Sequence, residues 1–216
     1  MMRNTLLEDG SCKSGMCWTK LAFLGFSCLI LGLPAHAQRQ HAGARLSEAE
    51  FVALADRCAP GAPPDTLLAI ARTESDLNPN AISINRPKAA AQRAGYRDGA
   101  LVLSKQPRDL SQAKAWLRWF GLHHYTVSIG LMQVNVEMAV ELGVKPEQLL
   151  EPCTNLKVGS SILIAAYSTA AQEIGAGFAA LETALSIYNT GDSIAGFHNG
   201  YVANVYAHAP RRALPF

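Results

Sequence analysis

The sequence predicts an all-α protein in which five to seven helices pack around one hydrophobic core. Apolar residues recur at three- and four-residue spacing through most of the chain, and Pro, Gly and Asn residues separate the periodic segments. No strand-like alternation of useful length and no internal repeat is found. Of the 216 residues, 49% are hydrophobic and 17% are charged, which is typical of a globular domain rather than a disordered chain.

The first 37 residues are expected to be a cleaved secretory signal peptide. Lys20 precedes the apolar run LAFLGFSCLILGLPAHA, which ends at Ala37 in the small-x-small pattern of a cleavage site. Two acidic residues near the start are unusual in a leader, so translation starting at Met16 is an alternative. The apolar run is short for a membrane span, which makes an uncleaved anchor the less favoured interpretation.

Residues 38–208 are then expected to form the folded domain, and residues 209–216 a loose tail. The leader holds three of the 19 basic and two of the 17 acidic residues, so the remaining chain carries a net charge of +1. Nucleic acid is therefore not expected as a partner.

The first two helices are predicted upstream of residue 80. Ser47 and Glu50 have the spacing of a capping box, and the helix that they start runs to about Cys58. Prolines at positions 63 and 64 favour the start of the second helix, and the Asn78-Pro79 pair ends it. Residues 80–107 lose this periodicity and are expected to form a loop-like insert.

Further helices are predicted between this insert and the tail. Ser111 is the expected cap of one helix, which carries aromatic residues on one face and ends near Gly121. Thr154 or Asn155 is expected to cap a long helix that Gly175 ends. The other expected helical segments are residues 135–142, 146–150, 178–188 and 202–206.

Glu74 lies on the apolar face of the second helix, in the same stripe as Leu67, Ile70 and Ala71. An ionised carboxylate on a buried stripe is costly unless it is paired or its pKa rises. A carboxyl group that stays protonated near neutral pH is suited to general acid catalysis. The alternative is that Glu74 lies near the helix end and points into water.

The stretch SIGLMQVN, residues 128–135, is a second candidate for a functional segment. Gly130 allows the backbone to approach another group closely, and the amides of Gln133 and Asn135 suit sugar hydroxyl and acetamido groups. The alternative is a turn before a helix, with Leu131 and Met132 in the core.

The stretch ALSIYNTG, residues 184–191, is the third candidate. Tyr188 can place its hydroxyl near a buried carboxyl group, and Asn189 can cap the helix or bind a ligand. The alternative is a helix C-terminus followed by a turn.

Two cysteines, Cys58 and Cys153, remain after removal of the leader, and in an exported protein they most simply form one disulfide. Neither has a Cys or His nearby at ligand spacing, and the adjacent residues His123 and His124 point apart on a helix. No metal and no cofactor is therefore expected.

The motifs ES, GLMQVN and YNTG together resemble those of the soluble lytic transglycosylase family, which shares the goose-type lysozyme fold. The resemblance covers residues 63–206. The stretches ESDLNPNAI and EPCTNLKVGSSIL resemble more specifically the lytic transglycosylases of type IV secretion and conjugation systems. This resemblance implies a lysozyme-like helical domain in the periplasm, with peptidoglycan strands as substrate, no stable membrane insertion and a secretion or pilus apparatus as its context.

The resemblance also implies a role for each motif residue. Glu74 would be the catalytic acid and Ser75 would help to orient it. The residues implied to bind the saccharide or support its groove are Gly130, Leu131, Met132, Gln133, Asn135, Tyr188 and Asn189. Two positions depart from the family pattern, because Thr73 stands where a bulkier residue is usual and Ile187 where a small one is.

The implied reaction is cleavage of the β-1,4 bond between N-acetylmuramic acid and N-acetylglucosamine. It would leave a 1,6-anhydro ring on the muramic acid, because the C6 hydroxyl of that sugar replaces water as the nucleophile. Two alternatives remain: a hydrolytic muramidase on the same fold, and a wall-binding assembly protein without activity.

Overall fold

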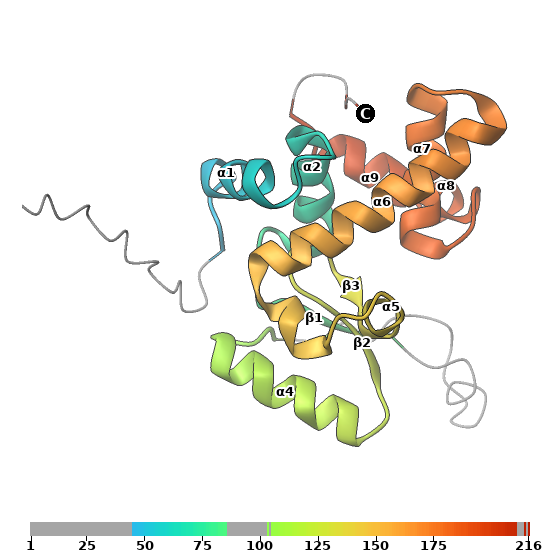
Figure 1. Ribbon diagram of the computed structural model, residues 1–216. Coiled ribbons are helices and arrows are strands. Elements are labelled where there is room, and N and C mark those ends of the chain that lie inside the picture. The colour runs from blue at the N-terminus through green and yellow to red at the C-terminus, as the bar shows by residue number, and fades with distance from the viewer. Residues whose placement is uncertain (1–44, 86–102, 104, 211–213, 215) are drawn as a thin grey trace, which may run out of the picture. The chain divides into compact units, whose positions relative to one another are not determined.

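The computed structural model describes residues 45–85, 103, 105–210, 214 and 216, which belong to one compact unit. The predicted signal peptide and most of the 80–107 insert lie outside these residues. The elements in chain order are α1 (Glu48–Cys58), α2 (Pro64–Ser75), β1 (Ile82–Asn85), α4 (Leu110–Leu122), β2 (Thr126–Ile129), β3 (Val134–Asn135), α5 (Val136–Glu141), the 3-10 helix η1 (Pro146–Leu150), α6 (Pro152–Ile174), α7 (Phe178–Thr190), α8 (Ala195–His198) and α9 (Tyr201–Ala207) (Figure 1).

The mainly helical class predicted from the sequence is confirmed. The described residues hold eight α-helices, of which α8 has only four residues, where five to seven helices were expected. None of the helices in these residues is long and apolar enough to cross a membrane.

A small antiparallel sheet, in the order β1-β2-β3, was not predicted. Ile82 pairs with Ile129, and Ser128 pairs with Asn135. The expectation of no strands was wrong here because strands of four, four and two residues are too short to give a clear alternating pattern. The loop-like insert expected from residue 80 therefore begins with a strand.

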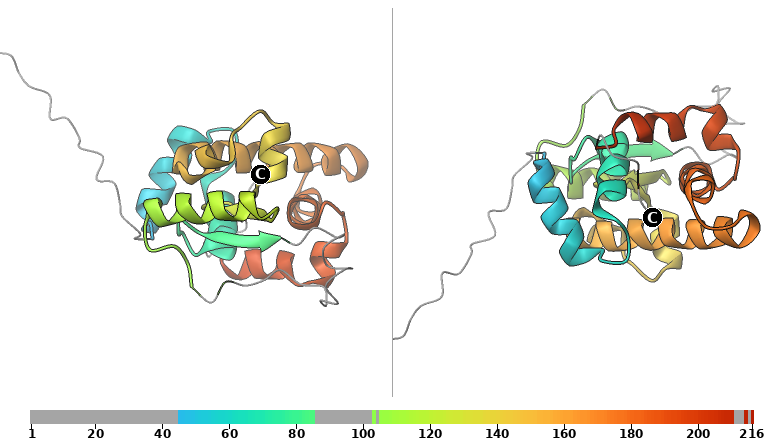
Figure 2. Two further views of the ribbon diagram at one scale, coloured as in Figure 1. Left: turned by 90° about the horizontal axis from the view of Figure 1, so that it is seen from below. Right: turned by 90° about the horizontal axis from the view of Figure 1, so that it is seen from above.

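One face of this sheet is apolar and buried. Helix α4 runs along the sheet on the side away from α2 and α6, as Figures 1 and 2 show, and its buried residues join the strand residues in one core cluster. The buried side chains of this cluster between the sheet and α4 are Ile82, Ile84, Val127, Ile129 and Val134 from the strands, and Ala113, Leu117 and Phe120 from α4.

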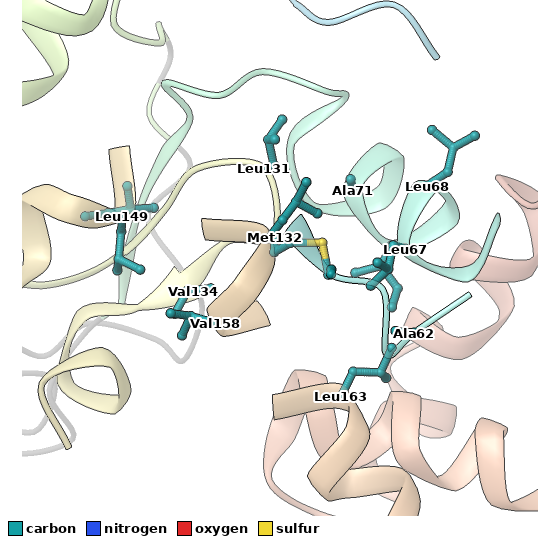
Figure 3. Close-up of a cluster of buried hydrophobic side chains, with 14 of the residues drawn as sticks. Ala62, Leu67, Leu68, Ala71, Leu131, Met132, Val134, Leu149, Val158 and Leu163 are labelled. Atoms are coloured by element: carbon teal, nitrogen blue, oxygen red, sulfur yellow. The ribbon is translucent and has the colours of Figure 1, made fainter. Parts of the chain in front are cut away.

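The core extends from the sheet to α2 and α6 through the turn that joins β2 to β3. Leu131 and Met132 of this turn are fully buried. Figure 3 shows Met132 among Leu67 and Ala71 of α2 and residues of α6. These two apolar side chains therefore anchor the turn in the core. This agrees with the alternative interpretation of the stretch, in which Leu131 and Met132 are core residues.

Three N-terminal helix caps were predicted, and one of them is confirmed. Ser47 and Glu50 form the expected capping box of α1. The cap of α4 is Asp109, whose carboxylate accepts from the N–H of Gln112 at 2.8 Å, and not Ser111. Glu151 caps α6, because a proline in the first turn starts this helix earlier than Thr154 or Asn155.

The predicted disulfide between Cys58 and Cys153 is present and joins the end of α1 to the start of α6. Part of the tail that was expected to be loose is packed. Leu214 is only 2% exposed, and the ring of Phe216 stacks on Tyr167 with 3.9 Å between centroids.

Reduction of this disulfide is expected to lower the free energy of unfolding by about 2–4 kcal/mol, because it frees a long loop in the unfolded chain. The bond closes a sequence separation of 95 residues. Urea unfolding with and without reductant measures the effect. A Cys58→Ala/Cys153→Ala variant serves as control, since its unfolding midpoint should not respond to reductant. An unchanged midpoint for the parent protein would contradict the prediction.

Candidate active site

Glu74 lies in the last turn of α2, where the chain leaves the helix abruptly. Asp76 and Leu77 adopt left-handed backbone conformations, with φ of 50° and 60°, and end the helix directly after Ser75. Glu74 is half-buried, and its carboxyl group meets a side chain from α9 instead of pointing freely into water. The structure thus favours the buried interpretation of this residue over the exposed one.

The Glu74 carboxyl group has an unusual environment. Burial raises its pKa from 4.5 to about 7, although a hydrogen bond from Tyr201 partly opposes this rise. The Tyr201 hydroxyl donates to Oε1 of Glu74 at 2.6 Å. Among the described residues, no second carboxylate contributes to the shift. Near neutral pH the carboxyl group can therefore both give and take a proton.

Tyr201 was missed by the sequence analysis, which singled out only its neighbours in the last helix. It is the first residue of α9 and is 9% exposed. Burial first, and then the nearby Glu74 charge, hold the pKa of its hydroxyl well above the usual value, so it remains a hydrogen-bond donor. The Asn199-Gly200 pair directly before Tyr201 is typical of a turn, and it could have indicated that a helix begins at Tyr201.

Asn189, one of the predicted site residues, is connected to Tyr201 through Asn199. The Asn199 amide donates to Oδ1 of Asn189 at 2.9 Å, and Oδ1 of Asn199 accepts from the backbone N–H of Tyr201 at 2.9 Å. Asn189 therefore supports the start of α9, two hydrogen bonds away from the Tyr201 backbone.

Tyr188 extends from α7 toward the turn between β2 and β3. Its hydroxyl donates to the Met132 carbonyl at 2.7 Å. Burial, and then the charge of Glu74, raise the pKa of this hydroxyl well above its usual value. The structure thus brings Tyr188 into electrostatic range of Glu74, as expected, with its proton held by the turn.

The hydroxyl of Ser75 holds the same turn. Its single proton is shared between the Leu131 carbonyl at 2.9 Å and the Ala71 carbonyl at 3.0 Å. Ser75 therefore connects the end of α2 to the turn, and its hydroxyl bonds to these carbonyls rather than to the carboxyl group of Glu74. Together, Ser75 and Tyr188 fix two successive carbonyls of the turn beside Glu74.

The turn itself has a special backbone. Gly130 has φ of 79° and Gln133 has φ of 44°. The Gln133 amide donates to the carbonyls of Ala81 and Gly130 at 3.1 and 3.0 Å, while its Oε1 accepts no hydrogen bond from the described residues. Asn135 caps α5 by accepting from the Glu137 N–H at 2.8 Å. These contacts make Gln133 the side chain of the turn that can still offer an acceptor to a ligand.

Leu131 and Met132 were expected to line a saccharide groove. Both residues are 0% exposed and lie in the core, so neither presents a side chain to a ligand in this structure. The described residues contain no cluster of three or more His, Cys, Asp or Glu side chains that could hold a metal ion.

Asn155 of α6 holds the turn through side-chain hydrogen bonds. It was considered only as a helix cap in the sequence analysis, which missed this contact. Its side chain is fully buried, accepts from the Met132 N–H at 2.8 Å, and donates to the carbonyls of Ile129 and Leu149 at 2.7 and 3.0 Å. A Cβ atom on Gly130 would lie 2.4 Å from the Asn155 amide nitrogen. The glycine is therefore required for this close approach as well as for its positive φ.

The sequence matches one protein family and several known proteins. The family described as the transglycosylase SLT domain matches residues 51–208, which include Glu74, the turn and Tyr201. The chain is 34% identical over 175 residues to "Protein virB1" of Agrobacterium fabrum, which covers 80% of this chain and 64% of that protein. It is also 34% identical over 171 residues to "Type IV secretion system protein virB1" of Brucella abortus, which covers 76% of this chain and 66% of that protein. The chain thus spans somewhat less than two thirds of the Agrobacterium protein, and no solved structure matches it.

Proposed function

Because the chain belongs to the transglycosylase SLT domain family, we propose that it is a peptidoglycan lytic transglycosylase in which Glu74 acts as both acid and base. The observation that carries this proposal is the single carboxyl group with a pKa of about 7. A group with a pKa near the working pH is protonated often enough to act as an acid and ionised often enough to act as a base.

In the first step, protonated Glu74 gives its proton to the glycosidic oxygen between N-acetylmuramic acid and N-acetylglucosamine. The bond from the muramic anomeric carbon to this oxygen breaks, and the N-acetylglucosamine hydroxyl leaves. Positive charge develops on the muramic ring, where the acetamido group of the same sugar stabilises it. Tyr201 donates to the Glu74 carboxylate that results.

In the second step, the Glu74 carboxylate accepts the proton of the muramic C6 hydroxyl. The C6 oxygen forms a bond to the anomeric carbon, which closes the 1,6-anhydro ring and restores protonated Glu74. No water is consumed. Glycosidases that use water usually need a second carboxylate, and no such group contributes to the electrostatics of Glu74 among the described residues.

The biological context follows from the relatives. The Brucella relative carries the name of a type IV secretion system protein. We infer that this chain acts in the periplasm and opens the peptidoglycan locally for a type IV secretion, conjugation or pilus apparatus.

Product analysis in water labelled with oxygen-18 tests the proposed reaction. Purified protein is incubated with peptidoglycan, and the soluble products are identified by mass spectrometry. Unlabelled anhydromuramoyl products are expected. Labelled reducing ends would instead identify a hydrolytic muramidase, and binding of peptidoglycan without any product would favour an assembly protein.

A further inference from the structure

Helix α9 is attached to the last turn of α2 at both of its ends. At its start, the Tyr201 hydroxyl donates to Glu74, as described above. At its end, His208 contacts Arg72 and Thr73, the two residues that precede Glu74 in the chain. One seven-residue helix thus spans two contacts to adjacent positions of α2.

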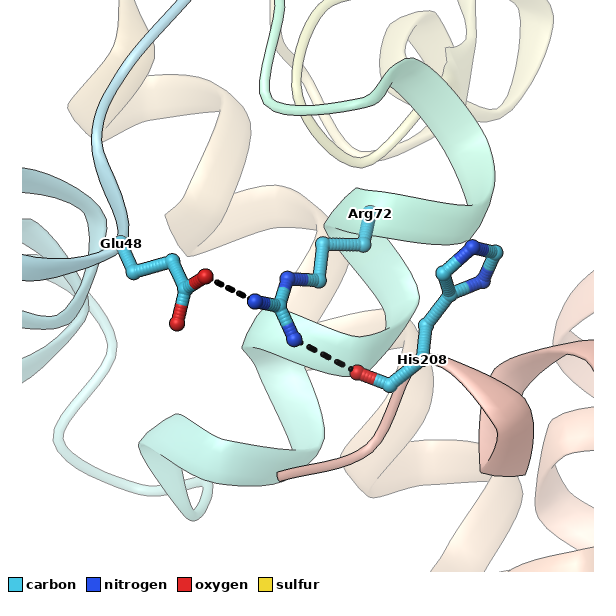
Figure 4. A network of polar contacts seen from close by, with 3 residues as sticks. All are labelled: Glu48, Arg72 and His208. Carbon is cyan, nitrogen blue, oxygen red and sulfur yellow. Dashed lines mark hydrogen bonds and ion pairs between the residues drawn. The ribbon is translucent and has the colours of Figure 1, made fainter. Parts of the chain in front are cut away.

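Three residues, Arg72, Thr73 and His208, meet at the end of α9. One guanidinium nitrogen of Arg72 donates to the His208 carbonyl at 2.9 Å, and the other pairs with Glu48 at the start of α1, as Figure 4 shows. The Thr73 hydroxyl lies 3.1 Å from Nδ1 of His208. The Thr73 hydroxyl also donates to the Ala69 carbonyl at 2.9 Å, and we therefore assign the contact with His208 as a hydrogen bond from Nδ1–H to the hydroxyl oxygen.

We propose that Thr73 and His208 are positioning residues for Glu74: together with Arg72 they fix the end of α9 on α2 and thereby hold the Tyr201 hydroxyl at the Glu74 carboxyl group. The effect on catalysis rests on the function proposed above, whereas the effect on the Glu74 carboxyl group does not. We call the contacts among Arg72, Thr73 and His208 the α9 latch.

The length of α9 makes this coupling direct. A helix of seven residues is about 10 Å long, or about two helical turns, and it moves as one rigid unit. A shift at one end is therefore transmitted to the other end. Because Thr73 and Glu74 are adjacent, a movement of His208 relative to Thr73 becomes a movement of Tyr201 relative to Glu74. A hydrogen bond of 2.6 Å to a charged acceptor is sensitive to such a movement.

The latch is not needed to keep α9 in the fold. Val202 and Val205 are 4% and 0% exposed and pack the helix onto the core. Their contacts are apolar and do not select one position along the helix as sharply as directional hydrogen bonds do. The latch therefore fixes the position of α9 along α2, whereas the apolar contacts keep α9 packed on the core.

The test compares five single variants in the full chain. Thr73→Val keeps the side-chain shape and removes the acceptor, and His208→Ala removes the donor. His208→Asn keeps an N–H donor close to the position of Nδ1. Asn204→Ala is the matched control, because Asn204 lies on the exposed face of the same helix. Tyr201→Phe serves as the reference for complete loss of the hydrogen bond.

The first readout is the titration midpoint of the Glu74 carboxyl carbon, followed by NMR. Loss of a hydrogen bond to the carboxylate should raise this midpoint above 7, and we expect about one pH unit in Tyr201→Phe and about half a unit in Thr73→Val and His208→Ala. His208→Asn should restore most of the parent value, and Asn204→Ala should match it. In Tyr201→Phe the further change His208→Ala should add no shift.

The second readout is the rate of peptidoglycan cleavage, which should fall about 10-fold in Thr73→Val and His208→Ala. Parent-like midpoints in both variants, alongside a shifted Tyr201→Phe, would overturn the latch. The NMR result does not depend on activity, so an inactive parent protein would count against the proposed function and not against the latch. If His208→Ala fails to fold, Thr73→Val alone decides the question.

Discussion

Replacing Glu74 with Gln is expected to abolish peptidoglycan cleavage and, at the same time, to stabilise the folded protein above pH 7. The loss of the proton donor and acceptor should lower the cleavage rate by about 10²- to 10⁴-fold. The shape of the side chain is kept, so the fold should not change. Cleavage assays and urea unfolding at pH 5 and pH 8 measure the two effects.

The stability effect follows from the raised pKa. In the unfolded chain Glu74 titrates near 4.5, and in the folded protein near 7. Between these values the folded state binds more protons than the unfolded state, so the free energy of unfolding falls as the pH rises from about 4.5 to about 7. The parent protein should lose as much as about 3 kcal/mol over this range. Gln has no charge to bury, so the variant should be more stable than the parent at pH 8 and nearly equal at pH 5.

Asp76→Asn is the matched control for this variant. The carboxylate of Asp76 is 65% exposed and pairs with Arg45 at 2.9 Å, only two residues from Glu74. Asn also tolerates the left-handed backbone of this position. Its stability should stay within about 0.5 kcal/mol of the parent at both pH values. A stability gain in Glu74→Gln that did not depend on pH would contradict the assignment of a raised pKa.

The contrast between Glu74 and Tyr201 shows how far the sequence could predict this site. A carboxylate on an apolar stripe is unusual enough to stand out, because burial of a charge is costly. A tyrosine among apolar residues at helical spacing is what an ordinary core helix also contains. The hydrogen bond between them joins residues 127 positions apart, and no local pattern encodes it.

Asn155 and the sheet were missed for related reasons. An Asn near the start of a helix is most often a cap, so its position alone did not reveal a buried contact to a turn 23 residues away. The strands have only four, four and two residues, so they leave no long alternating pattern in the sequence. The disulfide was predictable because only two cysteines follow the leader.

Replacing Asn155 with Ala is expected to cost about 3–5 kcal/mol of the free energy of unfolding and most of the activity. The change leaves the Met132 N–H and the carbonyls of Ile129 and Leu149 without their partner in the core. Each unsatisfied buried group costs about 1–3 kcal/mol, and entry of water would reduce the sum. Urea unfolding and the cleavage rate are the measurements.

Activity should fall because the turn carries the carbonyls that Ser75 and Tyr188 hold beside Glu74. Ser161→Ala is the control on the same helix: Ser161 is an exposed residue, and its hydroxyl bonds only to the nearby Val158 carbonyl among the described residues. This control should remain within about 0.5 kcal/mol of the parent.

A double-mutant cycle with Gly130→Ala tests whether Asn155 acts through its contact with the turn. In the parent background the new Cβ atom would lie 2.4 Å from the Asn155 amide nitrogen, so Gly130→Ala alone should be strongly destabilising. Once Asn155 is Ala, this clash is absent and only the strain of φ at 79° and the Leu149 carbonyl at 3.0 Å remain. The double variant should therefore lose clearly less stability than the sum of the single variants. Additive losses would mean that Asn155 stabilises α6 independently of the turn, and the turn geometry beside Glu74 would then need another support.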